Sequence, residues 1–467
     1  MRAIVWFRRD LRVHDQPALA CALRECNEII PLFIFDDLLL SSRQFGSTNV
    51  AFMLSCLEDL VESLQRLRLT FTWRRGEPVE ELAYAARELQ AAVVYWNRDY
   101  EPAAIERDRR AVHTLAQLGV ATKTYKDHVV FEARDVLSPE GGPLQRYGAY
   151  RRRWWEHWHA SPPGLTPRPT PSSPVKARTS RALPTLGDLG YDPPTVPWKG
   201  GEAVARRRLR RFLDGAVRDY ALDRNRPAVD GTSRLSPYFR FGALSTRTAI
   251  HAALATRRLK GSAWQSGVNA WIDELIWRDF FQQVLANFPN LTARAFHNSP
   301  RPPVRHNERL FQAWCRGLTG FPFIDAGMRQ LNRIGWMHNR VRMVAASFLV
   351  KDLRLDWRSG EQYFLQHLVD GDTAANNGNW QWCASTGTDA MPGFRIFNPA
   401  RQSQRFDPAG DYIRQYVPEL VHVPPTLIHR PELMTGEEQT RFSCRIGHDY
   451  PTPIVDHESA RRAYIGR

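Results

Sequence analysis

The chain has 467 residues, 43% of them hydrophobic and 24% charged, which predicts a globular protein of two or three domains. No apolar run is long enough to span a bilayer, and the N-terminus lacks the apolar stretch of a signal peptide, so we expect a cytoplasmic protein. Lysine and arginine outnumber aspartate and glutamate by 64 to 49, a formal charge of +15 that attracts polyanions, although a basic proteome gives the same excess without such a partner.

The first 130 residues alternate short apolar runs with amphipathic stretches. The apolar runs predict five strands, at 4–7, 29–35, 70–73, 92–96 and 121–125, and the stretches at 48–68 and 78–89 predict helices. Strands that alternate with helices imply an α/β domain with a doubly wound parallel sheet, which we place at 1–130. No GxGxxG follows the first strand, so the usual dinucleotide fingerprint is absent.

A long connector, 131–200, follows this domain. Ten prolines lie between positions 161 and 197 and predict an extended segment laid over a surface. Before them, Arg151, Arg152 and Arg153 precede two tryptophans in a predicted helix, where a solvated basic face is favoured over a binding patch.

From about residue 200 the pattern becomes helical, which predicts an all-α domain at 201–467. Helices are expected at 202–220, 246–257, 264–287, 323–334, 339–353 and 360–368. Eight of the 15 tryptophans lie between Trp264 and Trp382, where flat rings suit stacking on a flavin or on bases.

Two segments early in the helical domain gather polar and aromatic side chains. GTSRLS, at 231–236, offers hydroxyls and backbone N–H groups to an anion, although a plain helix cap is the favoured interpretation in isolation. In WIDELIWRDFF, spacings of three and four place Trp271, Glu274 and Arg278 on one helical stripe, with Trp277 beside it. The simpler alternative there is an ion pair between Glu274 and Arg278.

Two later segments are similar in character. DGDTAANNGNWQW, at 370–382, can bond to a heterocycle or stack on it. Asp370 and Asp372 also resemble hard-cation ligands, but no further acid follows at calcium-loop spacing, and the six cysteines form no CxxC pair, so we predict no metal site and reduced thiols. GWMHNRVRM, at 335–343, adds donors beside a tryptophan, with a basic helix face as an equal alternative.

Seven segments resemble, in order and spacing, those of the DNA photolyase/cryptochrome family: WFRRDLRVHD, DGTSRLSPYF, ELIWRDFF, TGFPFIDAGMRQL, GWMHNRVRM, DGDTAANNGNWQW and FRIFNP. The resemblance is closest to class I bacterial enzymes that repair cyclobutane pyrimidine dimers. It implies an N-terminal antenna-chromophore domain and a helical domain that holds a U-shaped FAD. It also implies a light-driven carbon–carbon lyase in which excited reduced FAD gives an electron to a dimer flipped out of DNA. We expect a monomer.

The resemblance implies FAD contacts by position. They are Tyr220, Thr232, Ser233, Arg234, Leu235, Ser236, Trp271, Asn339, Arg342, Asp370, Gly371, Asp372 and Asn376. Arg342 and Asp370 are expected to form an ion pair under the flavin ring. Asn376 is expected to face flavin N5 and to accept its hydrogen bond without adding negative charge.

The resemblance also implies contacts with DNA and the lesion. They are Arg224, Glu274, Trp277, Arg278, Asn339, Arg340, Met343 and Trp382. Trp277 and Trp382 are the expected aromatic walls around the flipped dimer. Glu274 is expected to bond the flipped base and to steady the charge that arrives with the electron, which makes it a catalytic residue.

Three tryptophans commonly pass electrons to oxidised flavin in this family. Trp380 and Trp357 match the inner and middle members, but the outer position holds Val304, whose side chain cannot carry a stable radical. Either the path ends at Trp357, or Trp314 or another aromatic residue replaces the outer member. We expect impaired photoreduction of oxidised FAD and intact repair by reduced FAD.

Related activities remain alternatives. Repair of (6-4) photoproducts is one alternative. The resemblance implies histidines in such a site, at the positions where this chain has Asn339 and Met343. A blue-light sensor usually adds a long C-terminal tail, and plant sensors usually carry aspartate at the Asn376 position; neither feature is in the sequence. A DNA-binding protein that kept the fold and lost repair is a further alternative. Glu101 matches a family position near a folate-type antenna, but deazaflavin binders have a similar stretch, so the identity of a second chromophore stays open, as does an empty antenna site.

Overall fold

The computed structural model describes residues 1–42, 44–170, 182–297, 304–390 and 392–466. The chain forms two compact units. Unit 1 comprises Met1–Arg218, Ser233–Thr292 and Val369–Ala374, and unit 2 comprises Asp219–Thr232, Ala293–Leu368 and Ala375–Arg467. Among the described residues, no helix is both long and apolar enough to cross a membrane.

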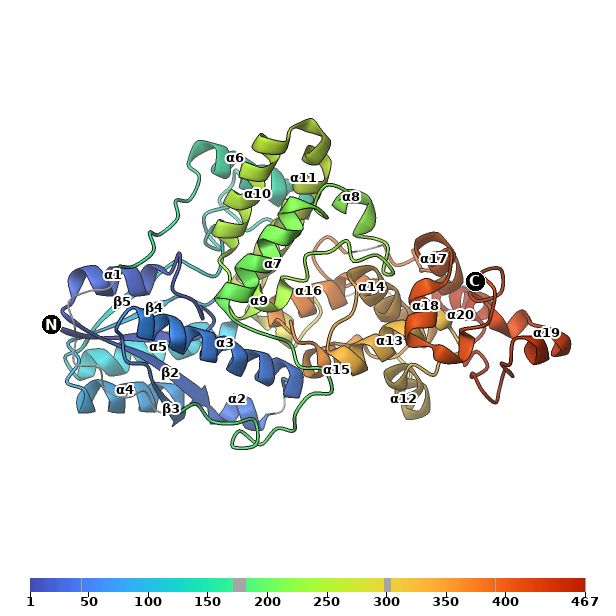
Figure 1. Cartoon of the computed structure of the whole chain (residues 1–467), viewed down its shortest axis with the longest axis horizontal. Coiled ribbons are helices and arrows are strands. Elements are labelled where there is room, and N and C mark those ends of the chain that lie inside the picture. Colours follow the sequence, from blue (N-terminus) through green and yellow to red (C-terminus); the bar gives the residue numbers. More distant parts are fainter. Residues whose placement is uncertain (43, 171–181, 298–303, 391, 467) are drawn as a thin grey trace. The chain divides into compact units, whose positions relative to one another are not determined.

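Unit 1 begins with a five-stranded parallel sheet of strand order β3-β2-β1-β4-β5 (Figure 1). The strands are β1 Arg2–Phe7, β2 Glu28–Asp36, β3 Thr72–Gly76, β4 Val93–Asn97 and β5 Ala121–Tyr125. All five predicted strands are confirmed, with small shifts at their ends. After β3 the chain returns to the other side of β1, so the sheet is doubly wound as predicted.

Helices cover both faces of this sheet, which is why its central strands are apolar except at their end residues. α4 (Pro78–Glu88) and α5 (Pro102–Gln117) pack on the face that carries Trp6 and Trp96. α1 (Pro17–Glu25) contacts β1, β4 and β5 and lies on the side opposite α4 (Figure 1). α2 (Asp37–Ser41) and α3 (Ser47–Arg66) follow β2. The helix α5 was not predicted, because its buried face consists of only Ala104, Ala111 and Leu115.

Five further α-helices lie wholly within unit 1 among the described residues. They are α6 Tyr147–Ala160, α7 Glu202–Asp214, α9 Ser236–Arg240, α10 Thr246–Lys260 and α11 Gln265–Asn287. The long helix α11 is bonded to the residues that follow the sheet, since Asp279 Oδ2 accepts from Val130 N at 3.0 Å and from Trp154 Nε1 at 3.2 Å. Helices α7, α9, α10 and α11 therefore share a compact unit with the sheet, and the predicted domains at 1–130, 131–200 and 201–467 stay predictions.

The proline-rich stretch is described at 161–170 and 182–197, and neither part contains a helix or strand. It lies against the surface of unit 1, where Trp73 Nε1 donates to Ala182 O at 2.9 Å and Tyr191 donates its hydroxyl to Leu40 O at 2.8 Å. The predicted position over a surface is confirmed there, but residues 186–190 form hydrogen-bonded turns in place of an extended segment. Pro171 and Pro174 lie outside the described residues.

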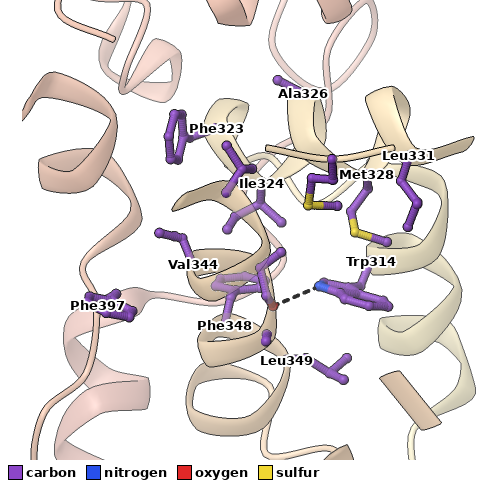
Figure 2. Packing of buried hydrophobic residues seen from close by; sticks show 14 of the residues in the cluster. Trp314, Phe323, Ile324, Ala326, Met328, Leu331, Val344, Phe348, Leu349 and Phe397 are labelled. Carbon is purple, nitrogen blue, oxygen red and sulfur yellow. Dashed lines mark hydrogen bonds between the residues drawn. The ribbon is translucent and has the colours of Figure 1, made fainter. Parts of the chain in front are cut away.

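Unit 2 is helical. Its helices are α8 Tyr220–Asp223, α12 Glu308–Arg316, α13 Pro322–Ile334, α14 Asn339–Ser347, α15 Trp357–His367, most of α16 Thr373–Cys383, α17 Pro399–Phe406, α18 Asp411–Tyr416, α19 Gly436–Arg441 and α20 His457–Ile465. Its core gathers Trp314, Phe323, Val344 and Phe348 (Figure 2). Trp314 Nε1 donates to Ala345 O at 3.1 Å, which fixes the indole inside this core.

Two predicted helices end earlier than expected. The helix predicted at 202–220 stops at Asp214, because the chain turns at Gly215 and Val217 N returns to Phe212 O at 3.0 Å. The helix predicted at 339–353 changes at Ser347 into a π-helical turn, Phe348–Asp352. Helix α16 was not predicted, because its asparagines and glycine are poor helix formers.

Candidate functional site

The hydroxyl-rich segment before α9 is braced within unit 1. Trp271 Nε1 on α11 donates to Ser233 Oγ at 3.3 Å, and Ser236 Oγ donates to Asp370 Oδ2 at 2.6 Å. Arg234 lies between the two serines with φ of 48°, a left-handed conformation that turns the chain, and Leu235 is buried. These two bonds bring four predicted FAD contacts of unit 1 together, namely Trp271, Ser233, Ser236 and Asp370.

The segment that contains Asp372 is held by side chains of unit 1. Arg240 Nε donates to Gly371 O at 2.6 Å, and Gln282 Nε2 donates to Asp372 Oδ1 at 3.1 Å. Arg9 forms an ion pair with the same carboxylate. Asp372 therefore serves as an acceptor inside the protein. No group of three or more histidine, cysteine, aspartate or glutamate side chains suited to a metal is present among the described residues.

A buried charged cluster surrounds Arg9. Its guanidinium lies 3.3 Å from Asp99 and 2.5 Å from Glu101, the residue expected near an antenna. Arg278 donates to His128 O at 2.6 Å and contacts His128 Nε2 at 2.7 Å. Burial and the neighbouring guanidiniums hold the pKa of His128 far below its usual value, so the ring is neutral and can accept a hydrogen bond.

Arg278 was predicted to contact DNA or to pair with Glu274, and its contacts within unit 1 bear on both expectations. Its guanidinium is directed to His128, and the nearest carboxylate in its contacts is Asp279 at 3.9 Å, so the ion pair with Glu274 is not formed among the described residues. Its side chain is only 13% exposed. These contacts favour a structural role for Arg278 over the predicted contact with DNA, because a bonded and buried guanidinium is not available to a phosphate.

The aromatic wall on unit 1 has two layers. Tyr147 on α6 stacks on Trp277 with ring centroids 3.6 Å apart and an interplanar angle of 7°. The hydroxyl of Tyr147 donates to Asp273 O at 2.9 Å, which fixes the ring against α11. Trp277 and Glu274 are both half-buried, three residues apart on one side of α11. Tyr147 was not predicted, because nothing in the sequence links it to a residue 130 positions away.

Asn376, on α16 in unit 2, is held in one orientation. Its Nδ2 donates to Glu361 O at 2.9 Å, which leaves the amide oxygen to accept from a ligand. The neighbouring Asn377 Nδ2 donates to Glu361 Oε1 at 2.8 Å. Burial raises the pKa of Glu361 to about 7, although the hydrogen bond from Asn377 lowers it. Glu361 was not predicted as a site residue, because it lies in no motif.

Trp380 and Trp357 are both buried in the core of unit 2. The ring of Trp380 lies edge-on to Phe364, with centroids 5.0 Å apart, and edge-on to Trp314, with centroids 6.2 Å apart. Trp357 lies under the guanidinium of Arg358, 4.8 Å from the ring centroid.

Four guanidiniums form a basic cluster on unit 2. Arg340 Nη2 donates to Asn225 Oδ1 at 2.6 Å, and its guanidinium lies 4.5 Å from the ring centroid of Phe406. Burial lowers the pKa of Arg340, and the charges of Arg224, Arg405 and Arg395 lower it further. Like charges gathered in this way favour an anion. Arg224 and Arg340 were predicted as DNA contacts; Arg405, from a stretch without a motif, was not.

The remaining predicted residues of unit 2 lie on several helices. Tyr220 is buried in α8, Thr232 is half-buried, and Asn339 at the start of α14 is exposed, with Nδ2 3.9 Å from Met343 Sδ. Met343 and Trp382 are half-buried and pack on the core of unit 2. Arg342 Nε donates to Met337 O at 2.8 Å. Arg342 and Asp370 belong to different units, so their ion pair stays a prediction.

Family models match most of the chain. A model described as DNA photolyase matches residues 3–172, and one described as the FAD binding domain of DNA photolyase matches residues 271–467. The chain is 40% identical over 474 aligned residues to a deoxyribodipyrimidine photo-lyase from Synechococcus sp., with 99% of this chain and 95% of the relative covered.

Solved structures of photolyases and cryptochromes have a similar fold. A class III photolyase from Agrobacterium tumefaciens has a TM-score of 0.89 and 34% identity, with 100% of this chain and 96% of that chain covered. A cryptochrome from Synechocystis sp. PCC6803 has a TM-score of 0.87 and 29% identity, with 99% of this chain and 98% of that chain covered. The protein belongs to the DNA photolyase family, and its C-terminal region is that family's FAD-binding domain.

Proposed function

We propose that the protein uses light to split cyclobutane pyrimidine dimers in DNA. The observation that carries the proposal is the 40% sequence identity, over 99% of this chain, to the Synechococcus deoxyribodipyrimidine photo-lyase. The chain also has Trp277, Glu274 and Trp382 at the positions expected for lesion contacts. An alternative is a cryptochrome-type sensor that binds DNA or a partner without repair, because the Synechocystis cryptochrome has nearly the same fold.

The described side chains fit FAD. Reduced FAD, when bound, supplies an electron that light makes available to the lesion. The turn that contains Ser233 and Ser236 offers hydroxyls and backbone N–H groups to a pyrophosphate. Asn376 offers a neutral acceptor to flavin N5, because its nitrogen is already committed to Glu361. The other FAD contacts are those expected from the resemblance, with Asp372 positioned by Arg9.

Trp277 and Glu274 are the proposed lesion contacts on unit 1. Trp277 is proposed to stack on one base of the flipped dimer, since Tyr147 covers the opposite face of its ring. Glu274, half-buried on the same helix, hydrogen-bonds the base and stabilises the charge that arrives with the electron. On unit 2, Trp382 is proposed as the second wall, and Met343 as a further lesion contact. Asn339 adds a polar contact.

The basic cluster of Arg224, Arg340, Arg395 and Arg405 is proposed to bind backbone phosphates beside the flipped nucleotides. Such contacts position the duplex and do not read its sequence. They also give an electrostatic, salt-dependent share of the affinity. Glu101 is proposed to lie near a second chromophore of folate or deazaflavin type.

Repair of a defined thymine dimer tests the proposal. Purified protein with chemically reduced FAD is incubated with an oligonucleotide that carries one dimer, in the light and in the dark. We expect loss of the dimer in the light only. Tight binding of the damaged oligonucleotide without loss of the dimer in the light would reject repair and leave the sensor alternative.

A further inference from the structure

A second aromatic path leads away from Trp380. Its ring meets Trp314 edge to face, with centroids 6.2 Å apart and an interplanar angle of 70°, and Trp314 meets Tyr363 with centroids 5.7 Å apart. Among the described residues, Trp357 makes no ring contact with Trp380. Val304, at the expected outer position, is 45% exposed and aliphatic. The path through Trp314 therefore has continuous ring contacts, whereas the expected path ends without a third tryptophan.

We propose that Trp314 and Tyr363 replace the missing outer tryptophan, and that Tyr363 is the terminal electron donor of this chain. The inference rests on the proposed function, because Trp380 can pass an electron only to a bound flavin. All three aromatic residues belong to unit 2, so the path itself lies within one compact unit.

The surroundings of Trp314 suit an intermediate carrier. The indole is fully buried, and its only described hydrogen bond runs from Nε1 to Ala345 O at 3.1 Å (Figure 2). A backbone carbonyl accepts a hydrogen bond but is too weak a base to take the proton. An oxidised Trp314 therefore keeps its proton and stays oxidising enough to take an electron from a neighbouring phenol.

The surroundings of Tyr363 suit a terminal donor. Its hydroxyl lies within hydrogen-bond distance of two acceptors, Asn332 Oδ1 at 2.7 Å and Cys315 O at 3.1 Å, and Asn332 is exposed. Burial raises the pKa of the phenol, so Tyr363 rests in its protonated form. Because Asn332 is exposed, loss of an electron is accompanied by release of the phenolic proton to solvent water, and the product is a neutral tyrosyl radical.

The electrons and protons balance along this path. Trp380 gives one electron to the photoexcited oxidised flavin, Trp314 restores Trp380, and Tyr363 restores Trp314. The O–H bond of Tyr363 breaks, its electron goes to Trp314 and its proton goes to water. An added thiol then gives Tyr363 a hydrogen atom, which restores the phenol and oxidises the thiol.

Radical spectroscopy on the full-length, FAD-loaded protein tests the path. Oxidised protein is illuminated without thiol, and radicals are identified by electron paramagnetic resonance with ring-deuterated tyrosine or tryptophan. We expect a tyrosyl signal in the wild type, loss of that signal in Tyr363→Phe with a tryptophan signal in its place, and loss of it also in Trp314→Phe. Tyr416→Phe is the matched control, since Tyr416 is a partly buried tyrosine of the same core.

The outcomes separate this inference from repair. A tyrosyl signal of wild-type size in Tyr363→Phe would overturn it, as would a wild type that forms only tryptophan radicals. If Trp314→Phe does not fold, the comparison of the wild type with Tyr363→Phe decides alone. Repair by chemically reduced protein is measured in parallel. Normal repair without a tyrosyl radical rejects the path alone, and a tyrosyl radical without repair rejects the proposed function alone.

Discussion

Trp277 is half-buried and stacks on Tyr147 with ring centroids 3.6 Å apart. We expect Trp277→Ala to weaken binding of dimer-containing DNA by about 1–3 kcal/mol, through loss of one stacking wall. Binding of undamaged duplex should change little, because it depends mainly on phosphate contacts. Titration of both DNAs by fluorescence anisotropy measures the difference. Equal losses on the two DNAs would show that Trp277 serves packing only.

Glu274 lies one helical turn before Trp277 and is half-buried. If it stabilises the charge on the reduced dimer, Glu274→Ala should lower the number of dimers split per absorbed photon and leave FAD bound. Quantum yield and flavin stoichiometry are measured on the same sample. Loss of flavin from the variant would instead assign Glu274 to the structure of the FAD site.

At the scale of elements, α15 and α16 are joined through the half-buried carboxyl of Glu361, which accepts from Asn377. The pKa of Glu361 rises from 4.5 to about 7 because of this partial burial. The folded state thus holds this proton more strongly than the unfolded chain does, so raising the pH from 4.5 through about 7 should cost stability. Glu361→Gln keeps an acceptor for Asn377 and has no proton to lose.

Thermal unfolding checks this linkage. We expect the melting temperature of Glu361→Gln, relative to the wild type, to be higher at about pH 8 than at about pH 5. An exposed replacement in the same unit, Glu308→Gln, is the control and should show no such pH-dependent gain. An equal shift of Glu361→Gln at both pH values would contradict the assigned pKa.

The elements also show what sequence can and cannot predict. Buried strands such as β1 and β4 were found because their apolar runs are continuous. The helix α5 was missed because most of its surface is charged, and α16 because asparagine and glycine disfavour helices. Partners far apart in sequence, such as Tyr147 with Trp277, depend on tertiary packing that no local pattern encodes.

At the scale of the molecule, a formal charge of +15 favours association with DNA. Part of this charge is concentrated in the cluster that contains Arg340 and Arg405. We expect Arg405→Ala to weaken binding of damaged and undamaged DNA equally and to reduce the salt dependence of the affinity by about one phosphate contact. Binding is measured over a range of salt concentrations. An unchanged salt dependence would place Arg405 outside the DNA contact.

The action spectrum of repair tests the central claim most directly. Protein with fully reduced FAD and no second chromophore is illuminated at a series of wavelengths, and the splitting of a single thymine dimer is counted per photon. The account predicts that the efficiency follows the absorption of reduced flavin. It also predicts that no dimer is lost in the dark. Dimer loss that is independent of wavelength, or no loss at any wavelength from protein that binds both FAD and the damaged DNA, would contradict it.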